Sequence, residues 1–272
     1  MSPIALPKLE EARLSSNIQG VAPTLLSIIR VPSSIRKLTV IHKDVGPDSD
    51  SAVEAVIPRL GQACSEIPGP RYLTVTRPDG RFQVPEGFEL TALQDSPGAN
   101  ALNTVPQNSQ VVTVVSLHTP PPWAPEFRDA SLPSPNPEHW AFCNVQEIKI
   151  EHVLPVTFWK ALSRIPTLVK LEYWVTQGDV GFLEALGERV DWKGDSGRCE
   201  PFSSLRVVWA RFQAMDSEHE VEYARNLAAV LDETRGMGST HLESLKFIGC
   251  VTVVDEDTLH LLRSAAAEVL WD

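Results

Sequence analysis

The sequence lacks the cysteine pairs and glycosylation sites that mark most small secreted proteins. Its four cysteines, Cys64, Cys143, Cys199 and Cys250, lie far apart and form no C-x-x-C pair. This spacing predicts neither a disulfide framework nor a zinc site. The chain also has no Asn-x-Ser/Thr acceptor. Both absences favour a reducing compartment, so we expect a cytoplasmic or nuclear protein.

A basic excess and long apolar runs are also missing. The formal net charge is −11, whereas nucleic acids and anionic membranes attract clustered Lys and Arg, so we expect neither as a partner. The first 14 residues lack the basic start and apolar core of a secretion signal, and no run approaches the roughly 18 apolar residues of a membrane span. Hydrophobic residues still make up 43% of the chain, which is enough for a packed core.

Familiar enzyme signatures are absent as well: the chain has no G-x-S-x-G, no G-x-x-x-x-G-K-S/T and no H-E-x-x-H. Residues 194–197 spell Gly-Asp-Ser-Gly, the surroundings of the nucleophilic serine in trypsin-like proteases, but no histidine stands in the segment that supplies the base there. We therefore predict that Ser196 lies in a loop, with a serine hydrolase as the alternative. We predict no catalytic residue, cofactor or metal site. We expect the acidic run 255–257 to lie at the first turn of a helix, where its negative charges interact favourably with the helix dipole.

One short pattern, apolar-x-x-apolar-x-apolar, returns along the chain. Clear copies start at residues 9, 35, 145, 168, 205 and 242, and weaker ones lie near residues 73 and 112. The first and last clear copies continue to Asn17 and Cys250, as the leucine-rich-repeat consensus requires. We therefore predict an α/β fold over residues 1–272. We expect a single leucine-rich-repeat-like domain, a curved solenoid of about eight irregular repeats, with short parallel strands on the concave side and helices on the convex side.

Helices are expected between these strands, over residues 48–63, 155–166, 178–190, 216–238 and 255–264. Pro58 should kink or end the first of them. Ser51 with Glu54, and Ser217 with Glu220, have the spacing of capping boxes. Residues 76–84 predict a hairpin with an Asp-Gly turn. Seven prolines within 118–138 predict an extended surface loop inserted into the domain.

Three runs, 144–186, 201–212 and 241–272, resemble the C-terminal halves of F-box leucine-rich-repeat proteins from mushroom-forming fungi. In that family an F-box docks on the adaptor of a cullin-based ubiquitin ligase, and the repeats recruit the protein to be modified. The resemblance therefore implies a non-catalytic module that binds a protein substrate on its concave face. An adaptor is expected only if an F-box lies upstream, because residues 6–17 already have the pattern of a repeat. The alternative is a stand-alone interaction or scaffold protein without a link to ubiquitin ligation.

The binding residues follow from the strand alternation. Side chains between the apolar positions should point out onto the concave sheet, which is the usual binding face of such solenoids. Trp and Arg are the residues most often found as interface hot spots, so we expect Trp174, Trp209 and Arg211 to form the main contact cluster. Either Trp could instead extend the core. The other candidates for partner binding on this face are Glu172, Lys149, Lys246, Arg13 and Lys37.

Overall fold

The computed structural model describes residues 4–5, 8–16, 21–44, 50–76, 86–94, 110–118, 135–177, 180–188, 201–213, 215–235, 241–250 and 254–272. It shows an α/β protein whose strands are mostly parallel, with six helices among these residues. The chain forms two compact units, Met1–Val145 (unit 1) and Gln146–Asp272 (unit 2), each with its own strands and helices. No helix in the described part of the chain is long and apolar enough to cross a membrane.

Five strands of unit 1 pair in an order that does not follow the sequence. They are β2 (Glu11–Ser16), β4 (Lys37–Asp44), β5 (Tyr72–Thr76), β6 (Glu86–Leu93) and β7 (Val111–His118). β2 and β7 both pair parallel with β4, whereas β6 pairs antiparallel with both β7 and β5. The expected hairpin over residues 76–84 lies outside the described residues except for Thr76, but β5 and β6 on either side of it pair antiparallel. The expectation of parallel strands is therefore wrong for β6, because the chain reverses direction between β5 and β6.

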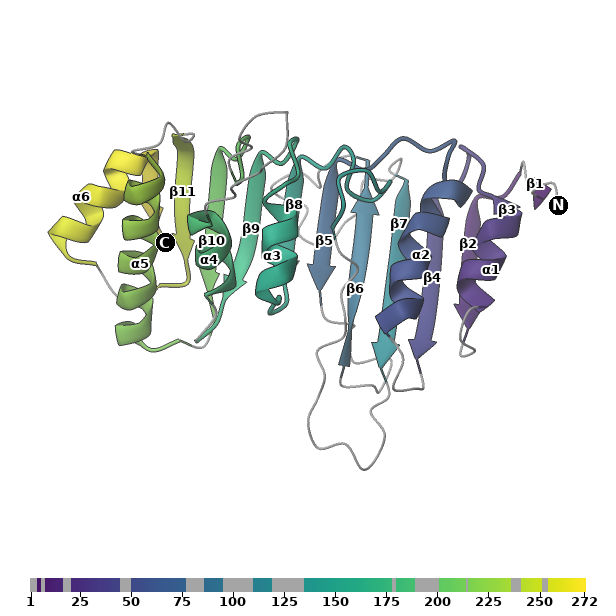
Figure 1. The fold of residues 1–272 in the computed structure, drawn as a ribbon, viewed down its shortest axis with the longest axis horizontal. Coiled ribbons are helices and arrows are strands. Elements are labelled where there is room, and N and C mark those ends of the chain that lie inside the picture. The colour runs from purple at the N-terminus through teal and green to yellow at the C-terminus, as the bar shows by residue number, and fades with distance from the viewer. Residues whose placement is uncertain are drawn as a thin grey trace, which may run out of the picture. The chain divides into compact units, whose positions relative to one another are not determined.

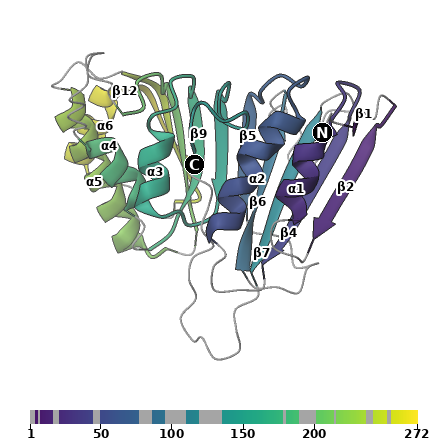
Figure 2. The ribbon, with the colours of Figure 1, turned by 45° about the vertical axis from the view of Figure 1, so that its right-hand side comes forward.

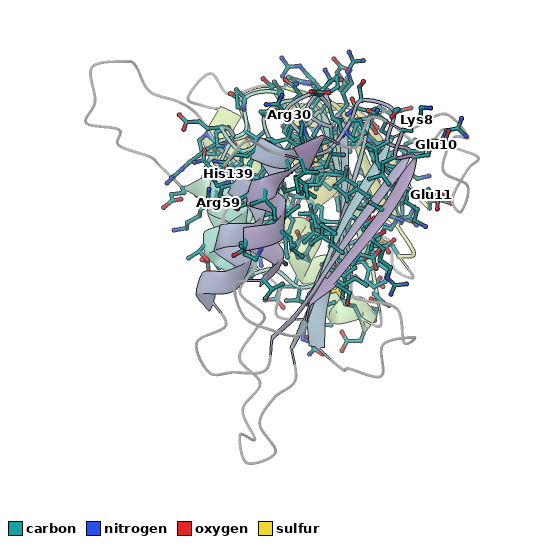
Figure 3. The ribbon with its side chains drawn as sticks, turned by 90° about the vertical axis from the view of Figure 1, so that its right-hand side faces the viewer. Lys8, Glu10, Glu11, Arg30, Arg59 and His139 are labelled. Atoms are coloured by element: carbon teal, nitrogen blue, oxygen red, sulfur yellow. The ribbon has the colours of Figure 1, made fainter. Side chains whose placement is uncertain are left out.

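The helices of unit 1 are α1 (Val21–Ile28) and α2 (Asp50–Ala63), which pack against each other. Figure 3 shows Arg59, of α2, on one side of the strands and Glu11, of β2, on the other. A separate parallel pair joins β1 (Ile4–Ala5) to β3 (Ile29–Arg30). Helix α1 was not predicted, and Pro58 does not end α2, which continues to Ala63. Pro58 is exposed, so its ring does not have to be accommodated in a packed core.

Unit 2 places its five strands in sequence order. They are β8 (Glu147–Glu151), β9 (Lys170–Val175), β10 (Val207–Phe212), β11 (Leu242–Ile248) and β12 (Ala266–Trp271). Every neighbouring pair is parallel. The helices are α3 (Val156–Leu162), α4 (Gly181–Gly187), α5 (Ser217–Arg235) and α6 (Glu256–Ala265). Figures 1 and 2 show α3, α4 and α5 against the same face of β8–β11.

Aromatic side chains fill the space between these helices and strands. Trp159 of α3 and Tyr173 of β9 meet edge-on with ring centroids 5.5 Å apart, and Phe182 of α4 contacts both rings. The hydroxyls of Tyr173 and Tyr223 are 2.6 Å apart inside this core. Leu171, Val208, Leu245 and Phe247 are all at most 1% exposed. The apolar strand positions therefore point towards the helices.

The helix starts in unit 2 differ in detail from the prediction. Asp216, rather than Ser217, caps α5: its carboxylate accepts the backbone N–H of His219 at 3.0 Å, and Ser217 is already helical. Glu220 is only 2% exposed, so it is not a solvated capping residue. Asp255 caps α6 by accepting the backbone N–H of Thr258, as the dipole argument for the acidic run predicts. β12, which follows α6 directly, was not predicted.

Candidate functional site

The face of the unit 2 strands opposite α3–α5 carries a dense set of polar and aromatic side chains, which we call the open face. Its members alternate with the buried positions along each strand. Strand register places them in rows across the sheet. The open face consists of Glu147, Lys149, Glu151, Lys170, Glu172, Trp174, Val207, Trp209, Arg211, Ser244, Lys246 and Ile248.

The central row of the open face contains a largely buried carboxylate. Register aligns Lys149, Glu172, Trp209 and Lys246 on four successive strands. Glu172 is only 9% exposed although it lies on the face opposite α3–α5. Arg211 donates from Nε to Oε1 of Glu172 at 2.5 Å. A charge-assisted hydrogen bond of this kind compensates for the partial desolvation of the carboxylate.

Lys170 lies in the row of the open face that contains Glu147, and its ammonium group contacts Trp209 in the central row. Lys170 Nζ lies 4.2 Å from the ring centroid of Trp209, and the same ammonium group is 3.2 Å from Oε2 of Glu147. The cation–π contact restricts the indole on the sheet surface. Trp209 is half-buried on this face.

The remaining lysines of the open face also have acidic partners. Lys149 forms an ion pair with Glu151. Lys246 Nζ lies 2.8 Å from Oδ2 of Asp272, and this ammonium group lowers the pKa of the Asp272 carboxyl. Each cation of the open face thus has a carboxylate beside it, so the face does not act as a broad electrostatic attractor.

Six of the eight predicted binding residues come together on the open face: Lys149, Glu172, Trp174, Trp209, Arg211 and Lys246. Trp174 is directly opposite Arg211 in register and is half-buried. Arg13 and Lys37 are exposed in unit 1, on β2 and β4. The prediction missed Glu147 and Lys170. Both lie two residues before a predicted member of the face, so extending the period-two alternation would have found them.

Two cysteine thiols of the described residues have strongly raised pKa values, and the described residues contain no metal-binding cluster. Burial raises the pKa of Cys64 to about 12, and burial together with the Glu220 carboxylate does the same for Cys250. Such thiols stay protonated near neutral pH. No group of three or more His, Cys, Asp or Glu side chains in the described part of the chain could hold a metal ion. Ser196 and the Pro-rich stretch 119–134 lie outside the described residues.

Comparison with known proteins adds no relative from which a role could be transferred. The chain matches no protein-family model, and it has no significant match among curated proteins or solved structures.

Proposed function

We propose that unit 2 is a leucine-rich-repeat-like module that recognises another protein, without catalysis, through its open face. The observation that carries the proposal is the combination of a sequential parallel sheet, helices α3–α5 against one of its faces, and two tryptophans on the opposite face. In repeat folds of this kind the strand-lined face is the usual binding surface.

Recurring backbone bonds support the repeat interpretation. In unit 2, the carbonyl of Gln146 accepts two successive N–H groups of the next strand segment, and the carbonyls of Val169 and Arg206 do the same, at 2.8–3.2 Å. In unit 1 the carbonyl of Glu10 accepts the N–H groups of residues 36 and 37 in the same way. A bond that returns at equivalent positions indicates one structural unit used several times.

A second recurring bond precedes the strands. The N–H groups of Ile35, Val145, Leu168 and Leu205 each donate to the carbonyl three residues earlier. Each of these residues opens a copy of the apolar pattern and is at most 3% exposed. The turn and the buried residue after it therefore start these four copies of the apolar pattern in the same way.

The chemistry of the open face supports recognition of a protein. Trp174 and Trp209 supply large amphipathic surfaces at low conformational cost, and Arg211 adds a planar cation. Because their neighbours already restrict Arg211 and Trp209, less side-chain entropy is lost on binding. On the resemblance to F-box proteins, the partner would be a protein destined for ubiquitin ligation.

A site-specific photo-cross-linker tests this proposal. We expect a benzophenone side chain at Ser244, on the open face, to capture a discrete partner in cell extract, while the same group at the exposed Glu184 of α4 does not. Trp174→Ala with Trp209→Ala should abolish capture but leave the circular dichroism spectrum unchanged. Equal capture from both positions would contradict a dedicated binding face, and unfolding of the double variant would show that the tryptophans belong to the core.

The same co-purified proteins test the link to ubiquitin ligation. Ligase adaptor and cullin among them would support that link, and their absence would favour a stand-alone role.

A further inference from the structure

Arg211 differs from the other cations of the open face in the donors it leaves unused. A guanidinium has five N–H donors, and here Nε is bonded to Glu172. Among the described residues the Arg211 side chain makes no other hydrogen bond or ion pair. Its side chain is 32% exposed. The four N–H groups on its two Nη atoms therefore have no partner among the described residues, on the face opposite α3–α5.

The neighbours of Arg211 in register have large apolar side chains. Trp174 on β9 and Ile248 on β11 are directly opposite Arg211 on its two sides. The indole N–H of Trp174 has no partner among the described residues. A polar group that docks between these side chains is shielded from water, which strengthens its hydrogen bonds to the guanidinium.

The hydrogen bond to Glu172 fixes the orientation of the Arg211 guanidinium group, and therefore the direction in which its Nη donors point. With Nε occupied, the edge formed by the two Nη atoms is the one left for a ligand, and it matches the two oxygens of a carboxylate. An arginine can bridge two carboxylates in this way because its donors point along different edges of one plane. The ammonium group of a lysine on this face acts as a point charge and does not present two parallel N–H donors to one carboxylate.

From this geometry we infer that Arg211 is the receptor for a carboxylate of the partner protein, an Asp or Glu side chain or a chain terminus, docked between Trp174 and Ile248. The inference rests on the proposed function, since it assumes that the partner covers the open face. The aliphatic part of the acidic residue packs on the indole and on Ile248, while its oxygens accept from both Nη atoms. Glu172 acts as a positioning residue that holds the guanidinium in place.

Selection from a random peptide library displayed on phage, using the full chain as bait, tests the inference. We expect the selected peptides to share an acidic residue, and its change to the amide to weaken binding at least about tenfold. Arg211→Lys keeps the charge but removes the fork, and it should weaken the acidic peptide to a similar degree. The two changes together should cost little more than either alone, because they remove the same contact. Arg164→Ala, an exposed arginine in the turn after α3, is the matched control and should bind like the wild type.

The outcomes separate this inference from the proposed function. Peptides that lose binding in Trp209→Ala, but tolerate both Arg211→Lys and the amide change, would overturn the carboxylate receptor and leave the recognition face intact. Failure to select any peptide, or peptides indifferent to Trp174→Ala and Trp209→Ala, would overturn the proposed function itself. Circular dichroism of each variant shows whether the fold is retained.

Discussion

Unit 1 and unit 2 build their strands from the same apolar pattern, yet the rows opposite their helices differ in chemistry. In unit 1 the middle row is formed by threonines on four strands, Thr39, Thr113, Thr91 and Thr74. In unit 2 the equivalent row carries charge and a tryptophan. The comparison shows that the buried positions specify the strand, whereas the positions between them are free to take on different roles.

The two units also differ in how the chain reaches each strand. In unit 2 a helix-containing connection leads to the next strand position each time. In unit 1 the chain leaves β4 through α2 for β5, and β6 and β7 later pair between β5 and β4. Unit 1 therefore depends on contacts between more distant segments, which form at a greater entropic cost.

The largest effect is expected from placing a charge in the core of unit 2. Leu245→Asp should destabilise the protein by at least about 3 kcal/mol, because Leu245 is fully buried and an unpaired carboxylate replaces it. Thermal denaturation and hydrogen exchange of β10–β12 measure this loss. Ser244→Asp, one residue away on the open face, is the control and should have little effect. A melting temperature like that of the wild type for Leu245→Asp would contradict the repeat assignment.

A smaller effect is expected from breaking the central pair of the open face. Glu172→Ala should cost about 1–2 kcal/mol, since Arg211 loses a charged acceptor but remains partly hydrated. Chemical denaturation of the two single variants and of Glu172→Ala with Arg211→Ala gives the coupling energy. A coupling near zero would show that the ion pair does not organise the open face.

In the threonine row of unit 1 the corresponding change should cost about 1 kcal/mol or less. Thr91→Val removes the hydroxyl that lies 3.2 Å from that of Thr113, and Thr113 is only 8% exposed. Denaturant midpoints compare this variant with Thr76→Val, one row away, as the control. A cost as large as that of Glu172→Ala would mean that the two rows do not differ in the strength of their polar contacts.

The smallest effect concerns the α6–β12 segment that closes unit 2. The backbone N–H of Thr258, with the Arg225 guanidinium, lowers the pKa of Asp255 to about 2. Its charge therefore stabilises the folded state above about pH 4, and this contribution disappears as the pH falls towards 2. Asp255→Asn keeps a capping oxygen but does not titrate. We expect the difference in melting temperature between wild type and variant to shrink over this pH interval, and a constant difference would contradict the assignment.

Much of the local structure was predictable because it depends on nearby residues. The residue pairs 38/40, 148/150, 171/173, 208/210 and 245/247 are buried strand positions in the structure, as the alternation predicts. Helix α1 was missed because Pro23 stands near its start and no capping signal precedes it. β12 was missed because it follows α6 without a turn residue and its alternation is weak.

The sequence by itself predicted most of the parallel strands and which of their side chains alternate between the buried and the opposite face, because period-two alternation is a local property of the chain. Only the tertiary structure decided which strands are neighbours. Strand pairing joins residues far apart in sequence, as with β7 beside β4 and Arg211 beside Glu172. The unused Nη donors of Arg211 follow from that pairing, because they depend on which neighbour already occupies Nε.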